Sequence, residues 1–345
     1  MYLRQVLKQY VECIRLKDWW NYIVPPVIGF YLWGLYQAQL NFKNAFFISS
    51  GFILLTFSVA SFGFFLNEWT DITDDRNAGK KNRVADLSVS LRIIIFIFIL
   101  LQMAAGHAIS IHSLHTNLLF GLQIILLVLY SCPPFRLKKY LHIAPLFDAF
   151  YSGTLFYLLA ININYPTFFG LTLTRKIALC MLFIWAITRG FRNIIIHFLE
   201  DIEYDSAISQ KTIGTHYDLS SIIKFLKWGL FPVEIISFCL FAFVERSRFG
   251  LTLGILYLLF IFYWINRKKY IIPYLVKRKN GELQIRIYDI NMFHEVILPL
   301  AACLFLIIKV DLNYFVYLFL LFLFFRDIRN WVIAILLLPA SLLKK

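Results

Sequence analysis

The sequence predicts an all-α protein that crosses a membrane several times. Of its 345 residues, 60% are hydrophobic, and the mean hydropathy is +0.70, whereas roughly half of the residues in a soluble domain are apolar. Several apolar stretches approach the roughly 20 residues that a membrane-spanning helix needs. These stretches lie at residues 22–38, 45–67, 91–110, 116–131, 143–161, 177–199, 221–244, 249–265, 293–310 and 313–325. Because the last is short, we expect a polytopic bundle of about nine or ten helices.

The distribution of the net charge of +14 predicts how the chain lies in the membrane. Lys and Arg concentrate in alternate connections: the N-terminus, then residues 76–83, 136–139, 211 and 267–286. Positive residues accumulate on the cytoplasmic side, so we expect the N-terminus, these connections and the acidic clusters beside them, at residues 67–75 and 201–205, to face the cytoplasm. The positive charge suits a lipid bilayer and a phosphorylated substrate. The chain has no basic soluble module, which argues against nucleic acid as a partner.

Two acidic motifs follow apolar stretches. Asn67, Asp71 and Asp75 stand four residues apart, and Asp201 and Asp205 repeat that spacing. A spacing of four keeps side chains on one face of a helix. Carboxylate and amide oxygens suit Mg²⁺, which is held by one or two carboxylates together with substrate phosphates. We therefore predict that these five residues are metal ligands; the alternative is that the aspartates only cap helices and solvate loops.

A polar stripe continues from the second acidic motif into the membrane. Arg189, Asn193 and His197 precede Asp201 at steps of four residues. In lipid such a stripe must face the protein interior or a wet cavity, so it predicts one wall of an active-site chamber. The alternative for Arg189 and His197 is an internal ion pair or hydrogen bond that only joins helices.

Other polar residues within the apolar stretches are candidates for binding an acceptor. Asp148, Glu234 and Glu295 each need a partner or a cavity, and Asn21 lies near the predicted mouth of the chamber. A buried, hydrogen-bonded carboxylate that fixes helix packing is an equal alternative for Asp148. For Glu234 that alternative is the preferred one.

Three segments together resemble the UbiA superfamily of intramembrane prenyltransferases. Asn67-Glu-Trp-Thr-Asp71-Ile-Thr-Asp-Asp75, with the basic residues after it, is similar to the first aspartate-rich motif of that superfamily, and Asp201-Ile-Glu-Tyr-Asp205 is similar to the second. The intervening Tyr130-Ser-Cys-Pro-Pro-Phe-Arg-Leu-Lys138 is similar to the loop that the family places between them. One departure is Glu68, where the family most often has Asp; this position points away from the stripe, so we expect little effect.

The resemblance implies a bundle of nine transmembrane helices around a central cavity, with Mg²⁺ and an isoprenyl diphosphate held by the two acidic motifs. It spans roughly residues 15–310 of one transmembrane domain, and we expect 311–345 to form an extra helical segment. Asp71, Asp75, Asp201, Asp205 and Lys138 are then the expected catalytic residues. The residues expected at the diphosphate are Asn67, Lys80, Lys81, Arg83, Arg136, Tyr130, Ser131 and Lys211.

The resemblance leaves two enzyme classes open. A prenyltransferase moves the isoprenyl group to a lipid-soluble or phosphorylated acceptor, which is an aromatic quinone precursor or a glycerol or sugar phosphate. A terpene cyclase on the same fold needs no acceptor. A cation transporter is disfavoured because it would need broken helices at the membrane midplane, whereas the acidic motifs lie near the boundary. The acceptor, the prenyl chain length and the oligomeric state do not follow from the sequence.

Overall fold

Nearly all of the described chain is helical, as predicted. The computed structural model describes residues 2–38, 40–163, 172–207, 211–245, 247–268, 277–279, 282–284 and 290–342. The first part of the chain forms α1 (Tyr2–Cys13), α2 (Leu16–Ala38), α3 (Phe42–Thr70), α4 (Ile72–Asn77), α5 (Val89–Ser110), α6 (Leu114–Ser131), the 3₁₀ turn η1 (Leu137–Lys139), α7 (Ile143–Ala149), the π-helical turn η2 (Phe150–Thr154) and α8 (Leu155–Asn162).

The second part of the chain is also helical, apart from one pair of short strands. It forms α9 (Leu173–Glu200), α10 (Ile202–Ala207), α11 (Ile213–His216), α12 (Leu219–Lys224), the π-helical turn η3 (Phe225–Leu230), α13 (Phe231–Val244), α14 (Arg248–Lys268), the π-helical turn η4 (Phe293–Ile297), α15 (Leu298–Lys309), the 3₁₀ turn η5 (Leu312–Tyr314), α16 (Phe315–Phe324) and α17 (Arg326–Leu342). Strands β1 (Lys277–Lys279) and β2 (Glu282–Gln284) pair antiparallel, with Arg278 opposite Leu283.

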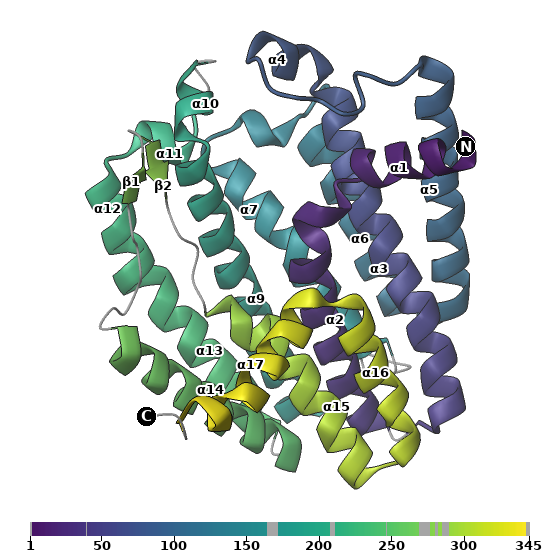
Figure 1. Ribbon diagram of the computed structural model, residues 1–345, viewed down its shortest axis with the longest axis vertical. Helices are drawn as coiled ribbons and strands as arrows, with labels where there is room; N and C mark the ends of the chain where they lie inside the picture. Colours follow the sequence, from purple (N-terminus) through teal and green to yellow (C-terminus); the bar gives the residue numbers. More distant parts are fainter. Residues whose placement is uncertain are drawn as a thin grey trace.

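The long helices pack into a bundle in which α2 is central (Figure 1). The helix α3 runs along α5 on one side, α9 runs along α13 on the other, and α2 contacts both α8 and α15 between them. Six stretches within the described residues are long and apolar enough to span a membrane: Phe42–Thr70, Val89–Ser110, Leu114–Ser131, Ile143–Asn162, Leu173–Glu200 and Leu219–Val244. The other predicted spans are helical but are not among these six, so the predicted number of nine is not confirmed.

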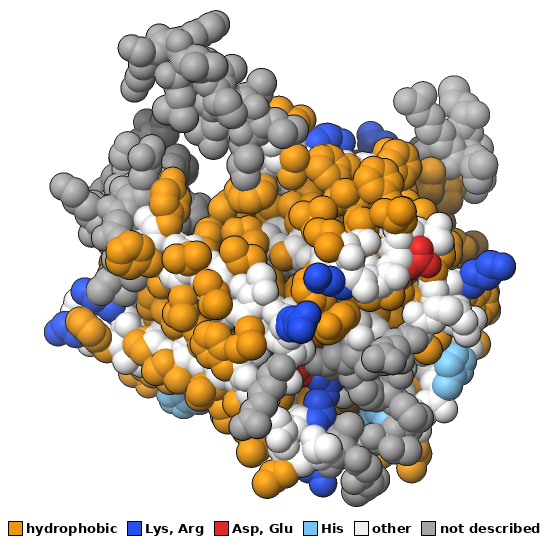
Figure 2. Space-filling view, turned by 90° about the horizontal axis from the view of Figure 1, so that it is seen from below, with side chains coloured by type: hydrophobic (Ala, Val, Ile, Leu, Met, Phe, Trp, Pro, Cys, Tyr) orange, Lys and Arg blue, Asp and Glu red, His pale blue; other side chains and the backbone are white. Residues whose placement is uncertain are grey.

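The bundle exposes apolar side chains where lipid would surround it. On α5 these include Ile93, Ile94, Ile97 and Leu101. A soluble monomer rarely exposes contiguous apolar patches of this kind. Figure 2 shows the end of the bundle opposite α4 and α10, where hydrophobic side chains dominate and Lys and Arg are only scattered. The chain is therefore an integral membrane protein by fold and composition.

The sequence fixes several helix ends by side-chain capping. Ser88, Ser113 and Thr172 each accept a hydrogen bond from the backbone N–H three residues later, at the starts of α5, α6 and α9. Such caps satisfy donors that the helix leaves free. The helix α6 ends at Ser131, directly before Cys132, Pro133 and Pro134, as the two prolines predict.

Glycine permits two close helix contacts. A Cβ on Gly106 of α5 would lie 2.6 Å from the backbone nitrogen of Leu55 on α3. A Cβ on Gly190 of α9 would lie 2.8 Å from the Cα of Ala149 on α7. The second contact brings α7 and α9 close together beside Asp148 and Arg189, each one residue away from the crossing.

A buried ion pair joins α9 to α13. Arg192 donates from Nε to Glu234 Oε2 at 2.7 Å and from Nη2 to Glu234 Oε1 at 3.0 Å, and also donates to Asn291 Oδ1 at 2.7 Å. Both charged side chains are fully buried. The structure thus confirms the preferred interpretation of Glu234 as a packing carboxylate. Its partner, Arg192, lies one residue off the polar stripe and was not among the predicted functional residues.

Candidate active site

The first acidic motif keeps its four-residue geometry although the helix bends there. The Asp71 backbone N–H donates to Asn67 O at 3.1 Å, and the Asp75 N–H donates to Asp71 O at 2.8 Å. The helix α3 ends at Asp71 and α4 begins after it, and these i to i−4 bonds continue across that residue. The predicted alignment of the three side chains is therefore preserved by the backbone.

Two cations from the loop after α6 meet this motif. Lys138 Nζ donates to Asn67 Oδ1 at 2.7 Å and contacts both carboxylate oxygens of Asp71. Arg136, held in a left-handed conformation at φ 43°, also contacts Asp71 and lies 2.9 Å from Asp74. Burial lowers the pKa of Lys138, while the neighbouring Asp71 carboxylate opposes that shift. The loop thus concentrates positive charge at the acidic motif.

The second acidic motif has the same backbone pattern and lies at the same end of the bundle. The Asp201 N–H donates to His197 O at 3.0 Å, and the Asp205 N–H donates to Asp201 O at 2.9 Å. Lys80 connects the two motifs, because its backbone N–H donates to Asp75 O at 2.8 Å and its Nζ lies 3.4 Å from Asp201 Oδ2. In Figure 1, α4 and α10 mark this end of the molecule. Lys80 therefore contacts both acidic motifs, which are called the acidic rims below.

Of the other residues predicted at the diphosphate, Arg83 is paired with a buried carboxylate, and Lys81 and Lys211 are exposed. Arg83 pairs with buried Glu68, with Nη1 2.9 Å from Oε1 and the backbone N–H 2.9 Å from Oε2. Glu68 thus points away from the stripe, as predicted, and holds the loop. Lys81 and Lys211 are exposed, and their roles stay predictions. Asn82, which the sequence did not single out, donates to Asp75 Oδ2 at 2.8 Å.

A second polar group lies next to the first motif, between α6 and α7. Tyr151 donates from its hydroxyl to Asp148 Oδ1 at 2.8 Å, and the Tyr130 ring lies 5.1 Å from the Tyr151 ring. The amide of Gln123 donates to the Tyr151 carbonyl at 2.9 Å, and Ser131 is buried at the end of α6. Asp148 is thus a hydrogen-bonded carboxylate at the end of α7, and its partner Tyr151 lies in the π-helical turn η2. Such π-helical turns are frequent at functional sites.

The polar stripe on α9 continues downward from the second acidic motif. His197 Nε2 lies 3.8 Å from Asp201 Oδ2, and Asn193 accepts from Asn291 at 3.3 Å. Arg189 lies 3.2 Å from Glu295 Oε1 and also contacts the Tyr157 hydroxyl. The ion-pair alternative is therefore what the structure shows for Arg189. Asn21, on α2, is half-buried, and its Oδ1 has no partner among the described residues.

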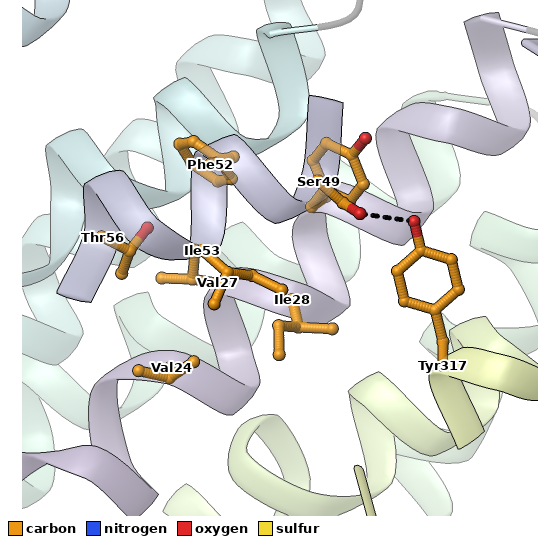
Figure 3. Close-up of a pocket in the computed structure, with 9 residues that line it drawn as sticks. Val24, Val27, Ile28, Ser49, Phe52, Ile53, Thr56 and Tyr317 are labelled. Carbon is orange, nitrogen blue, oxygen red and sulfur yellow. Dashed lines mark hydrogen bonds between the residues drawn. The ribbon is translucent and has the colours of Figure 1, made fainter. Parts of the chain in front are cut away.

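An enclosed cavity lies apart from the acidic motifs, between α2, α3 and α16. Its lining is apolar and comprises Val24, Val27, Ile28, Tyr31, Ser49, Phe52, Ile53, Thr56 and Tyr317. Figure 3 shows Ser49 and Tyr317 joined across one side of it, with 2.6 Å between their hydroxyl oxygens. This cavity is therefore a packing feature beside the C-terminal segment and contributes no charged group to the candidate active site.

The donor set of the acidic motifs fits a hard divalent cation. All five predicted ligands supply oxygen, and Asp205 Oδ2 is buried without a hydrogen-bond partner in the described part of the chain. No group of three or more His, Cys, Asp or Glu residues there is gathered as a finished metal cage. Mg²⁺ does not require one, because it retains waters and shares substrate phosphates.

Protons and Mg²⁺ should compete for the carboxylates of Asp75 and Asp205. Burial raises the pKa of Asp75 and of Asp205, and the Asp71 carboxylate adds to the shift at Asp75. A carboxyl group whose pKa is raised in the folded state stabilises the fold in its protonated form. This contribution is complete below the ordinary Asp pKa near 4 and is lost as the pH rises through the raised pKa. Because Mg²⁺ binds the deprotonated form, its thermal stabilisation of the protein should grow as pH rises.

Melting curves in detergent with and without Mg²⁺, from about pH 4 to about pH 7, measure this effect. The variant Asp75→Asn/Asp205→Asn is the matched comparison, because it removes both titrating groups at nearly constant size. It should show a smaller Mg²⁺ effect with little pH dependence. An equal, pH-independent Mg²⁺ effect in both proteins contradicts the prediction.

Comparison with known proteins identifies the fold. The chain matches no family model and no curated protein by sequence. It is similar to a UbiA homologue from Archaeoglobus fulgidus bound to GPP and Mg²⁺, with a TM-score of 0.61 and 17% identity over 85% of this chain and 98% of that chain. It is also similar to a digeranylgeranylglyceryl phosphate synthase, with a TM-score of 0.53 and 15% identity over 86% of this chain and 94% of that one. The chain therefore has the fold of the UbiA homologues.

Proposed function

We propose that this protein is a Mg²⁺-dependent integral membrane prenyltransferase of the UbiA superfamily. It transfers an isoprenyl group from its diphosphate to an acceptor, which is an aromatic quinone precursor or a glycerol or sugar phosphate. One observation carries the proposal. At one end of the bundle, Lys138 and Arg136 contact Asp71 of the first acidic motif. At the same end, Lys80 contacts Asp201 of the second. The structures with GPP or DMAPP and Mg²⁺ bound have the same fold and support this substrate class.

The chemistry requires charge neutralisation beside a dry chamber. When the allylic carbon–oxygen bond breaks, the leaving diphosphate gains negative charge, and preorganised cations stabilise it electrostatically. Lys138, Arg136 and Lys80 lie where they can do so. The allylic cation left behind must be kept from water, which a chamber within a bilayer provides. Aromatic faces contribute roughly 0.5–2 kcal/mol each to stabilising such a cation.

The divalent metal would be held by the acidic rims. Asn67, Asp71 and Asp75 would bind from one side, and Asp201 and Asp205 from the other. When bound, Mg²⁺ supplies Lewis-acid stabilisation of the diphosphate charge. The protein's own groups then orient the diphosphate, with Lys138 placed between Asn67 and Asp71. We place this end of the bundle and the N-terminus at the cytoplasmic face, on the charge distribution of the connections.

A terpene cyclase is the second candidate function, because the same diphosphate chemistry precedes it. Asp148, hydrogen-bonded to Tyr151, is compatible with both functions. A carboxylate in the chamber wall can orient an acceptor or take its proton. A cyclase also needs a base, so the products decide between the two.

The experiment is to incubate the purified protein with geranyl and farnesyl diphosphate, with Mg²⁺ or EDTA, and with or without candidate acceptors. We expect diphosphate release that requires Mg²⁺ and an acceptor. Terpene hydrocarbons or alcohols formed without an acceptor would favour the cyclase. If Mg²⁺ promotes neither binding nor consumption of any allylic diphosphate, the proposed function is wrong.

A further inference from the structure

From His197 towards Arg189, the polar stripe on α9 becomes progressively more buried. The His197 side chain is 57% exposed and the Asp201 side chain 32%, Asn193 is half-buried, and the Arg189 side chain is only 6% exposed. One turn further down, Trp185 is fully buried. Solvent-accessible side chains on the stripe thus end above Arg189.

An ion pair closes the stripe at that depth. Arg189, on α9, pairs with Glu295 on η4 at 3.2 Å, and its guanidinium carbon lies 5.7 Å from the Tyr157 ring centre. Both charged side chains are largely buried. Separating the pair to admit hydrocarbon would leave an uncompensated charge in an apolar surrounding, which is strongly unfavourable. A prenyl tail therefore meets a barrier here.

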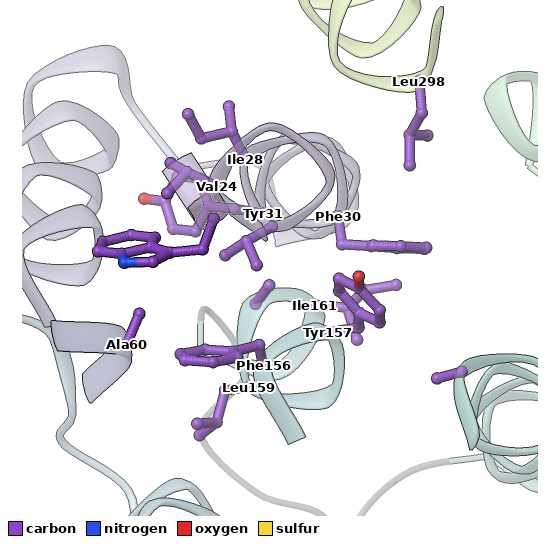
Figure 4. Packing of buried hydrophobic residues seen from close by; sticks show 14 of the residues in the cluster. Val24, Ile28, Phe30, Tyr31, Ala60, Phe156, Tyr157, Leu159, Ile161 and Leu298 are labelled. Atoms are coloured by element: carbon purple, nitrogen blue, oxygen red, sulfur yellow. The ribbon is translucent and has the colours of Figure 1, made fainter. Parts of the chain in front are cut away.

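Aromatic rings pack tightly beneath this ion pair. Trp185, Tyr157 and Phe30 lie with their ring centres 5.2–5.4 Å apart, and all three are buried. Figure 4 shows Phe30 on α2 lying against Tyr157 on α8. Because protein interiors are close-packed, a chain cannot pass between the three rings of this aromatic plug without displacing one of them.

The distance between the acidic rim and this floor limits the length of the donor. Asp201 follows Arg189 by 12 residues along α9, which is about 18 Å at the helical rise of about 1.5 Å per residue. An extended isoprene unit has four bonds of about 1.5 Å along the chain and advances about 5 Å. This segment of α9 is therefore about as long as three extended isoprene units.

We propose that the Arg189 to Glu295 ion pair, resting on the plug of Trp185, Tyr157 and Phe30, is the floor of the donor site and restricts the donor to about three isoprene units. The inference rests on the proposed function, since it takes the diphosphate to be held at the acidic rims. It assigns Arg189 and Glu295 to donor selection, a role distinct from binding the acceptor.

The test measures Mg²⁺-dependent binding of non-hydrolysable thiolodiphosphate analogues with two, three, four and five isoprene units to the full-length protein in detergent. Calorimetry needs no acceptor, so the result does not depend on identifying one. We expect affinity to rise from two to three units and to fall at least tenfold with four or five. Equal or tighter binding of the longer analogues would overturn the floor while leaving the proposed function intact. If no analogue binds, both are wrong.

Two variants and one control locate the floor. Arg189→Leu/Glu295→Leu replaces the pair by apolar groups, which removes the charges without leaving one unpaired, and Trp185→Ala opens the plug. Each should raise the affinity for four units relative to three by at least tenfold. Phe249→Ala removes a buried ring that packs on Trp33 and Phe305, outside the stripe, and should leave that ratio unchanged. Ratios unchanged in both test variants would contradict the proposal, because the ratio is insensitive to a general loss of stability.

Discussion

Asp71→Asn is expected to reduce Mg²⁺-dependent consumption of an allylic diphosphate by about 10³-fold or more, in line with the loss of a preorganised electrostatic group. The carboxylate has two functions in this structure. It is a predicted metal ligand, and it also anchors Lys138 and Arg136, which both contact it. An amide of the same size preserves the packing but removes the charge that holds Lys138 and Arg136. The rate of diphosphate release from farnesyl diphosphate measures the effect.

Asp201→Asn should have an effect of the same order, because it removes the carboxylate that Lys80 approaches at 3.4 Å. Asp86→Asn is the control: it lies in the same connection as Lys80 but is exposed, so its rate should remain near that of the unmodified protein. Melting temperatures of the three variants separate loss of chemistry from loss of fold. Near-normal turnover in Asp71→Asn and Asp201→Asn would refute the assignment of the acidic motifs.

The spacing of the acidic residues could be predicted from the sequence because it depends on local helical geometry. Residues four apart lie on the same face of any helix. The backbone hydrogen bonds from Asp71 to Asn67 and from Asp205 to Asp201 maintain this spacing in the structure. The prolines after α6 are equally local. The all-α class and most helix positions followed from apolar length alone.

Partners far apart in sequence could not be predicted in this way. Arg83 was expected at the diphosphate, yet it pairs with Glu68, because the loop folds back over the end of α3. Arg192 was missed, although an Arg within an apolar helix needs a partner and Glu234 was already known to need one. The pairing depends on the crossing of α9 and α13, which a single sequence does not reveal.

The π-helical turns also escaped prediction. The sequence predicts an apolar span at residues 143–161, and the structure contains it as Ile143–Asn162, but with the π-helical turn η2 at Phe150–Thr154. A π turn inserts one extra residue into the hydrogen-bond pattern and thereby re-aims the side chains around it. In η4 it coincides with His294 and Glu295, both of which are directed into the protein. Tertiary packing selects such turns, and local propensity does not.

The buried pair of Arg192 and Glu234 predicts the largest effect on stability. Either single substitution, Arg192→Leu or Glu234→Leu, should lower the free energy of unfolding by about 3–5 kcal/mol, because it leaves one buried charge without its partner. Both side chains are fully buried and joined by two hydrogen bonds. Exposed pairs, in contrast, contribute about 0–1 kcal/mol.

The double variant Arg192→Leu/Glu234→Leu distinguishes a charge effect from a packing effect. With both charges replaced by apolar groups, its stability should lie closer to that of the original protein than that of either single variant. Lys8→Leu, which removes one partner of an exposed pair 3.9 Å long, is the control and should change stability by less than about 1 kcal/mol. Unfolding in mixed detergent micelles measures the free energy of unfolding of the original protein and of the four variants. If the double variant lost the sum of the two single effects, the pair would contribute no coupling, and these side chains would matter for their volume alone.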